Sequence, residues 1–167
     1  EGKRIGETLC YVYYKKYKSN IKVIRPFNVF GPGMSKEDTR VIPSIVKSLR
    51  KNKNITIFNN GKQTRTFCYV TDAIDGFLKT LINGKKGEIY NIGNEKNEIS
   101  MNDLAKKIKQ SFQNQSKIIN SDYPATYPGN EPQRRCPDIY KARKKLGFRP
   151  KVNIDQSLDL FIKYYIS

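Results

Sequence analysis

The 167-residue sequence contains no histidine, only three cysteines and few acidic side chains. Without histidine, the chain cannot supply a histidine-based catalytic triad or most kinds of zinc site, and we expect no bound metal. The cysteines Cys10, Cys68 and Cys136 are far apart and odd in number, which indicates neither a disulfide framework nor a Cys-x-x-Cys metal site. A reducing cytoplasm is therefore the expected compartment.

Long hydrophobic runs are also missing, and no stretch approaches the roughly 18 apolar residues that a membrane span needs. The first residues, Glu-Gly-Lys-Arg, resemble neither a signal peptide nor an initiator segment. We therefore expect a soluble protein whose printed sequence starts inside a longer chain. Hydrophobic residues still make up 37% of the sequence, which is enough for one globular domain with a core.

Acidic residues are outnumbered by basic ones, 15 against 32, which gives a formal net charge of +17. Such a charge raises nucleic acid or an anionic membrane surface as possible partners. The lysines, however, are spread along the whole length and form no basic arm or block of five like charges. We interpret the charge as solvated surface and expect neither nucleic acid nor a membrane as a partner. A basic binding module stays the alternative.

Residues 25–33, Arg-Pro-Phe-Asn-Val-Phe-Gly-Pro-Gly, are the stretch around which the rest of the chain is organised. They follow an apolar, β-branched run at residues 21–24, which is typical of a parallel strand buried on both faces. In open α/β sheets the ligand crevice lies outside the carboxyl ends of the strands. The polar and glycine residues of this turn are therefore placed to meet a substrate.

Helices and strands are predicted to alternate along the chain, which indicates an α/β fold. Capping residues support several of the helix starts: Thr39, Thr71 or Asp72, Ser100 with Asp103, and Asp138. Apolar stripes are expected on the first helix, at Ile5, Leu9, Val12 and Tyr17, and on the third, at Ile74, Phe77, Leu78, Leu81 and Ile82. The predicted helices cover residues 4–18, 41–49, 74–82, 101–112, 139–146 and 154–165, and the predicted strands cover residues 21–24, 55–58, 67–70, 88–92 and 117–120.

Residues 122–137 are predicted to form a long extended loop, because they contain Pro124, Pro128, Pro132 and Pro137. Long loops inside compact domains are usually functional. The same segment carries the adjacent pair Arg134-Arg135, so we expect this loop to contribute to a binding site.

Five blocks of residues occur in order along the chain. They are Glu-Gly-Lys-Arg at residues 1–4, Arg-Pro-Phe-Asn-Val-Phe-Gly-Pro at 25–32, Gln-Thr-Arg-Thr-Phe at 63–67, Tyr-Asn-Ile-Gly at 90–93 and Pro-Gln-Arg-Arg-Cys-Pro-Asp at 132–138. With these blocks the chain resembles the C-terminal half of the extended short-chain dehydrogenase/reductases, the NAD-dependent epimerase/dehydratase family that acts on nucleotide sugars. The resemblance covers essentially the whole chain, residues 1–167. It implies the C-terminal part of a Rossmann-like, doubly wound parallel sheet plus a small α/β substrate-binding subdomain.

Within the family the chain looks most like the UDP-glucuronate decarboxylases, which have Glu-Gly-Lys-Arg after the catalytic tyrosine and a Pro-Gln-Arg-Arg-like loop. Asn28-Val29 and the Gly-Pro-Gly at 31–33 depart from that pattern and are equally familiar among epimerases and dehydratases. A UDP-sugar 4-epimerase and a nucleotide-sugar 4,6-dehydratase are therefore alternatives. A non-catalytic remnant or a basic binding module is the alternative of another class.

The resemblance also implies roles for residues near the cofactor. Lys3 matches the lysine of the family's Tyr-x-x-x-Lys motif, whose tyrosine would lie two residues before Glu1. It is the expected catalytic residue and would also hold the nicotinamide ribose of NAD. Val29 and Arg40 match further positions near the cofactor. The glycine-rich dinucleotide fingerprint would belong to an N-terminal half.

Substrate contacts are implied for Tyr13, Asn28, Arg65, Arg134 and Arg135. Tyr13 either contacts the substrate or packs as an aromatic on the sheet. Asn28 matches the asparagine that hydrogen-bonds the nucleotide sugar. Arg65 and Arg135, with Arg134 as the competitor of Arg135, are the expected ligands of the diphosphate or the sugar carboxylate, because guanidinium groups bind such oxygens bidentately. The family also usually forms homodimers through a four-helix bundle, to which the first helix would contribute.

Overall fold

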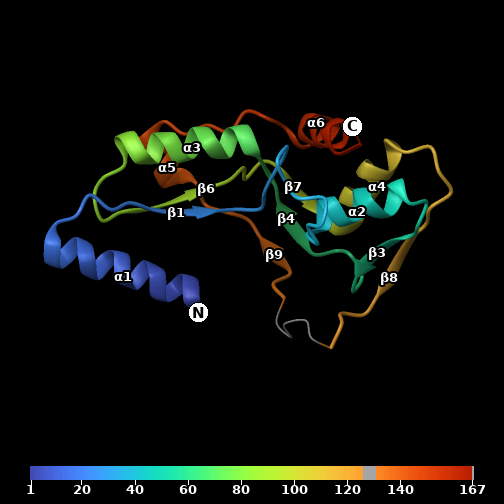
Figure 1. Ribbon diagram of the computed structural model, residues 1–167, viewed down its shortest axis with the longest axis horizontal. Helices are drawn as coiled ribbons and strands as arrows, with labels where there is room; N and C mark the ends of the chain where they lie inside the picture. The colour runs from blue at the N-terminus through green and yellow to red at the C-terminus, as the bar shows by residue number, and fades with distance from the viewer. Residues whose placement is uncertain (126–130, 167) are drawn as a thin grey trace.

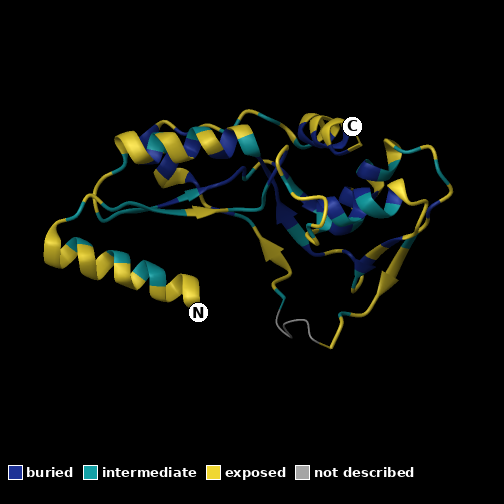
Figure 2. Cartoon of the chain, viewed as in Figure 1, coloured by how far each residue is buried: buried dark blue, intermediate teal, exposed yellow. Residues whose placement is uncertain are grey.

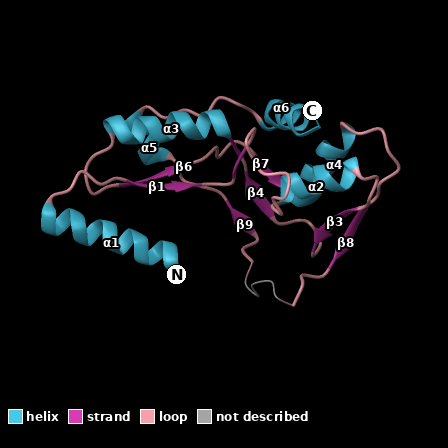
Figure 3. Cartoon of the chain, viewed as in Figure 1, coloured by secondary structure: helices cyan, strands magenta, loops and turns pink. Residues whose placement is uncertain are grey.

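The computed structural model describes residues 1–125 and 131–166, so predicted loop residue Pro128 lies outside the described residues. Helices and strands alternate as predicted, and the α/β class is confirmed (Figures 1 and 3). The helices are α1 (Gly2–Tyr17), α2 (Val41–Arg50), α3 (Val70–Asn83), α4 (Met101–Gln110), α5 (Tyr140–Leu146) and α6 (Ile154–Ile166). The strands are β1 (Val23–Pro26), β2 (Val29–Phe30), β3 (Ile55–Phe58), β4 (Thr64–Thr66), β5 (Cys68–Tyr69), β6 (Ile89–Ile92), β7 (Glu98–Ser100), β8 (Ile118–Ser121) and β9 (Arg134–Arg135).

One part of the molecule is built on the parallel pair β1 and β6, in which Val23 lies opposite Ile89 and Pro26 opposite Ile92. Figure 1 shows α1 on one side of this pair and α3 with α5 on the other. The other part holds the sheet β7-β4-β9 and the parallel pair β3 and β8, with α2, α4 and α6 packed around them (Figure 1). Strands β3 and β5 pair with β8 and β2, so they lie off the β1-β6 pair.

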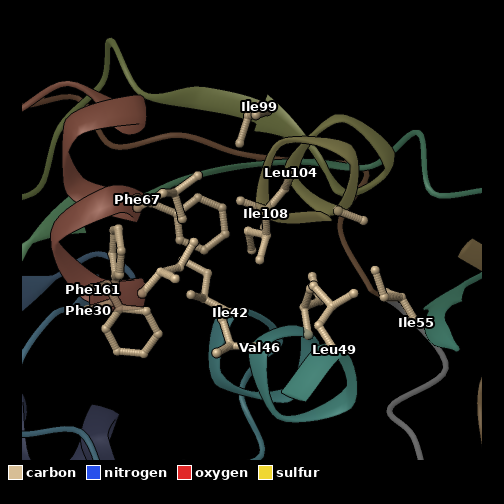
Figure 4. Packing of buried hydrophobic residues seen from close by; sticks show 14 of the residues in the cluster. Phe30, Ile42, Val46, Leu49, Ile55, Phe67, Ile99, Leu104, Ile108 and Phe161 are labelled. Atoms are coloured by element: carbon tan, nitrogen blue, oxygen red, sulfur yellow. The ribbon is translucent and has the colours of Figure 1, made fainter. Parts of the chain in front are cut away.

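The larger hydrophobic core lies in the second part. Side chains from α2, α4 and α6 point toward one another there and form one cluster with side chains from the strands (Figure 4). Phe30 is at the edge of this core, with its ring centroid 6.1 Å from that of Phe67 and 5.8 Å from that of Phe161, both in edge-on geometry. Edge-on aromatic packing adds to the burial of apolar area, so it fixes β2 against α6. The turn after β1 is thereby anchored to the core.

The apolar stripes predicted for α1 and α3 do not face the sheet. All nine stripe residues of the two helices are exposed (Figure 2). Helix α3 instead packs on β6 through small residues, Ala73, Gly76 and Thr80, because a helix that approaches a sheet this closely has no room for large side chains. Helix α1 rests on the rest of the chain through Tyr14, whose ring lies against Gly87, and through an ion pair between Glu7 and Arg25.

One predicted cap and one predicted helix end, at residue 146, agree with the structure. Ser100 caps α4, since its Oγ accepts the backbone N–H of Asp103 at 3.1 Å and donates to the Asp103 carboxylate at 2.7 Å. Gly147 ends α5 in the left-handed conformation, with a φ of 64°. Asp138 accepts the N–H of Tyr140 at 2.8 Å, although the residue that precedes the helix is Ile139 rather than Asp138.

Two other predicted caps are wrong. Helix α2 begins after Arg40, not after Thr39, and helix α3 begins after Tyr69, so neither Thr71 nor Asp72 is its cap. The carboxylate of Asp72 accepts instead the backbone N–H groups of residues 151 and 152, at 3.0 and 2.9 Å. The partners of this buried carboxylate are nearly 80 residues away in the sequence. A local sequence pattern therefore could not predict these hydrogen bonds.

Two strand predictions and one loop prediction also need correction. The strand expected at residues 67–70 is only the two-residue β5, β4 ends just before it, and residue 70 already starts α3. The strand expected at residues 21–24 lies at Val23–Pro26, and Arg25 and Pro26 are exposed rather than buried on both faces. The segment expected to be a plain loop contains β9, because Arg134 and Arg135 pair with β4.

Candidate functional site

A cavity of about 690 Å³ lies where α1 and the end of β1 meet α2, β3, β4 and β9. The turn at residues 25–33, expected to meet a ligand, forms part of its wall. Of the predicted site residues, six line this one cavity: Lys3, Asn28, Val29, Arg40, Arg65 and Arg135. Tyr13 and Arg134 do not line it. The volume is within the range of about 300–1,000 Å³ that is typical of small-molecule sites.

Asn28 lies in the cavity wall between β1 and β2. Its φ of 40° is in the left-handed region, which asparagine tolerates better than most residues. The side-chain Nδ2 donates to the carbonyl oxygen of Thr66 at 2.7 Å, and the backbone oxygen of Asn28 accepts the N–H of Cys68 at 3.2 Å. These bonds fix the amide in one orientation, so that its position in the cavity wall is set before a ligand arrives.

Arg65 and Arg135 lie opposite one another on the parallel strands β4 and β9. The side chain of Arg65 is only 9% exposed, and its Nη1 donates to the carbonyl oxygen of Thr64 at 2.7 Å. Its Nη2 binds the carboxylate of Glu131, and Nη2 of Arg135 lies 3.7 Å from the same carboxylate oxygen. This part of the cavity therefore holds two guanidinium groups and one carboxylate, with a net positive charge.

Arg134 points away from this cluster, because neighbouring residues of a strand face opposite sides of the sheet. Its Nε and Nη2 both donate to the carboxylate of Glu98 at 2.8 Å. These hydrogen bonds, with a further one from the hydroxyl of Thr64, hold the pKa of Glu98 below its ordinary value. Of the two competing arginines, Arg135 is thus the one that faces the cavity.

The three predicted cofactor residues all line the cavity. Lys3 lines it from the first turn of α1, and it pairs with no acid in the described part of the chain. Arg40 donates from Nη1 to the carbonyl oxygen of Val29 at 3.4 Å. The same guanidinium group binds Asp38, and these hydrogen bonds lower the pKa of the Asp38 carboxyl.

Tyr13 lies outside the cavity on the exposed side of α1. Its ring centroid is 5.3 Å from that of Tyr17, one turn further along the same helix. Its predicted contact with substrate stays a prediction.

Among the lining residues that were not predicted as site residues, Gln63 and Glu131 lie near the arginines in sequence. Gln63 is buried, and its Nε2 donates to the carbonyl oxygen of Phe58 at 3.0 Å, while its Oε1 has no hydrogen-bond partner among the described residues. Glu131 joins the two arginines, as described above. Gln63 stands two residues before Arg65 in the sequence, and Glu131 stands four residues before Arg135. Closeness in sequence to the two predicted arginines was the signal that could have identified them as cavity residues.

Neither a metal centre nor a membrane-spanning helix is found over residues 1–125 and 131–166. No three His, Cys, Asp or Glu side chains of this part come together as metal ligands. No helix there is both long enough and apolar enough to cross a bilayer.

The model of the NAD dependent epimerase/dehydratase family matches residues 1–93. UDP-glucuronic acid decarboxylase 1 of Xenopus tropicalis is 36% identical over 168 residues, which cover 99% of this chain and 38% of that protein. UDP-glucuronic acid decarboxylase 3 of Arabidopsis thaliana is 36% identical over 163 residues, or 96% of this chain and 45% of that protein. The chain thus spans less than half the length of these relatives.

A solved structure gives the same result for the fold. UDP-glucuronic acid 4-epimerase from Bacillus cereus, in complex with UDP-glucuronic acid and NAD, superposes with a TM-score of 0.85 at 30% identity. The match covers 96% of this chain and 50% of that one. The resemblance found in the sequence blocks is confirmed, and the chain belongs to the NAD-dependent epimerase/dehydratase family.

Proposed function

We propose that this chain is the nucleotide-sugar-binding part of an NAD-dependent enzyme, and that the reaction is the decarboxylation of UDP-glucuronate. The observation that carries this proposal is the convergence of six predicted residues, from five separate segments of the chain, on one cavity. The names of the relatives support the choice of reaction.

The arginine cluster suits the anionic part of such a substrate. Arg65 and Arg135 present guanidinium groups from neighbouring strands, and two forked donors can bind a diphosphate or a carboxylate at several oxygens at once. Asn28 adds an amide, which can donate and accept hydrogen bonds without adding charge. Binding of UDP would therefore depend on the phosphates more than on the nucleoside.

The α1 side of the cavity fits the nicotinamide end of NAD. Lys3 offers an ammonium group that pairs with no acid in the described residues, so it is available to donate to ribose hydroxyls. Val29 and Arg40 would lie beside it. NAD would supply the oxidation of the sugar at carbon 4 and the later return of the hydride.

Lys3 would also stand one helical turn after the tyrosine of the family's Tyr-x-x-x-Lys motif. Its positive charge would favour the phenolate over the phenol, so that the tyrosine could take the proton of the 4-hydroxyl. The resulting 4-ketone lies β to the carboxylate. The bond to the carboxylate then breaks, carbon dioxide leaves, and the ketone takes up the electron pair as an enolate, which is protonated before the ketone is reduced again.

The same cavity would also serve a UDP-sugar 4-epimerase or a 4,6-dehydratase, because both reactions pass through the same kind of 4-keto intermediate. The likeness to the Bacillus cereus epimerase favours the first of these as the second candidate. The test is an assay of the protein that carries this chain, with NAD and UDP-glucuronate labelled in the carboxylate. We expect labelled carbon dioxide and a UDP-pentose. A UDP-hexuronate epimer without carbon dioxide would contradict decarboxylation and establish the epimerase.

We further propose a homodimer in the cytoplasm. The exposed apolar residues of α1, among them Ile5, Leu9 and Val12, support this, because an apolar helix face of this kind favours a partner helix. In sedimentation experiments, the unsubstituted protein should have twice the mass of one chain, and a Leu9→Lys variant should sediment as a monomer. A parent that is monomeric at micromolar concentration would contradict the proposal.

A further inference from the structure

We propose that Glu131 is a positioning residue, which holds the guanidinium groups of Arg65 and Arg135 so that both face one ligand anion. The inference rests on the proposed function, because the anion is taken to be the diphosphate of a nucleotide sugar. The inference goes beyond the proposed function, because it assigns a role to a carboxylate inside a site for an anionic ligand.

The register of the sheet creates the need for such a residue. Arg65 of β4 lies directly opposite Arg135 of β9 in the parallel pairing, so the two side chains leave the sheet on the same face. Like charges directly opposite one another on neighbouring strands repel. Without a shared counter-ion, the two guanidinium groups would turn apart.

Glu131 is placed to act on both arginines. One of its carboxylate oxygens binds Nη2 of Arg65 and lies 3.7 Å from Nη2 of Arg135. The carboxylate is 18% exposed, and the Arg65 side chain is 9% exposed, so water screens their attraction little. Neither guanidinium group has another acidic partner among the residues that the structure describes.

The backbone around Glu131 is also held in place. Pro132 follows it and favours an extended conformation of the preceding residue. The N–H of Thr64 donates to the carbonyl oxygen of Gln133 at 2.8 Å, which joins this segment to β4 just before Arg134. Glu131 is therefore attached to the same sheet as the arginines that it binds.

The opposite face of the sheet provides a built-in comparison. There Arg134 has a carboxylate of its own, Glu98, which it binds with two hydrogen bonds of 2.8 Å. That pair is complete and lies outside the cavity. On the cavity face two arginines share one carboxylate, so one positive charge stays available for a ligand anion.

The test measures binding of UDP and of uridine to the 167-residue chain by calorimetry, in the parent and in Glu131→Gln. The substitution keeps the size of the side chain and removes its charge. We expect it to weaken UDP binding by roughly tenfold, since a small misorientation of binding groups has effects of this order or larger. Uridine, which has no phosphate, should bind as it does to the parent.

Three further variants separate positioning from a general structural role. Glu98→Gln, the matched control on the opposite face, should bind UDP like the parent, and Glu131→Asp should recover part of the lost affinity. In an Arg135→Ala background, Glu131→Gln should cost less than in the parent, because a residue that acts through Arg135 is coupled to it.

The outcomes are distinguishable. A parent that binds UDP no better than uridine overturns both the proposed function and the role of Glu131. A parent that prefers UDP, together with a Glu131→Gln variant that binds UDP equally well or more tightly, overturns only the role of Glu131. If Glu131→Gln loses UDP and uridine affinity equally, the substitution has a general structural effect, and the positioning role of Glu131 is overturned as well.

Discussion

Gly76 of α3 lies directly against Ile92 of β6: a Cβ at Gly76 would stand 2.5 Å from Cγ2 of Ile92 and 3.0 Å from the ring of Phe148. Ile92 is fully buried, so its methyl group has little room to move. This contact sets the distance between the helix and the strand, and it explains why the large apolar residues of α3 face outward.

Replacing Gly76 by alanine should destabilise the chain, although alanine favours a helix by about 1 kcal/mol over glycine. The added methyl group overpacks the contact with Ile92, at a typical cost of about 1–3 kcal/mol. Denaturant titration of Gly76→Ala should therefore show a lower unfolding midpoint. Gly6→Ala is the matched control, since a Cβ at Gly6 in α1 meets nothing within 4 Å, and it should raise the midpoint. A higher midpoint for Gly76→Ala would contradict the packing.

The thiol of Cys68 should be inert in the folded chain. Burial raises its pKa to about 12, with a smaller contribution from the charge of Asp72. Against the ordinary value of 9.0, the thiolate fraction at pH 8 falls roughly a thousandfold, and the thiolate is the reactive form. A thiol reagent at pH 8 should label Cys10 and Cys136 first and Cys68 only on unfolding. Labelling of the parent should therefore have two fast phases and one slow phase, and the slow phase should be missing in Cys68→Ala. Three labelling phases of equal, fast rate in the parent would contradict the burial of Cys68.

Much of the local structure could be predicted from sequence. The cap of α4 by Ser100 was predictable because both partners, Ser100 and Asp103, lie within one turn. The end of α5 at Gly147 was predictable for the same reason, since glycine favours the left-handed conformation found there. In both cases the signal and the structure that it determines occupy neighbouring residues.

Contacts over long sequence separations could not be predicted in this way. The alignment of Arg65 with Arg135 depends on the pairing of two strands about 70 residues apart, and β9 is too short to have an apolar pattern of its own. The same holds for Asp72, whose partners lie nearly 80 residues away. The resemblance to the family predicted both arginines as ligands of an anion, but only the structure shows that the Glu131 carboxylate contacts both of them.

The ion pair of Glu98 and Arg134 should make a contribution to stability that depends on pH. Hydrogen bonds from Arg134 and Thr64 lower the pKa of Glu98 in the folded chain. The contribution is therefore fully present above the ordinary pKa of glutamate, about 4.3, and is lost as the pH falls through the lowered value. The difference in unfolding free energy between the parent and Glu98→Gln should be larger at pH 7 than at pH 3. An unchanged difference would contradict the lowered pKa.

The most direct test of the account compares Arg135→Ala with Arg134→Ala in the binding of UDP and uridine by calorimetry. Arg135 faces the cavity and Arg134 faces away from it. We predict that the parent prefers UDP and that Arg135→Ala loses roughly tenfold or more in UDP affinity, as expected for a charged hydrogen bond. Arg134→Ala and all uridine affinities should stay at the parent level. If Arg135→Ala binds UDP as tightly as the parent does, the cavity is not the diphosphate site and the proposed function loses its support.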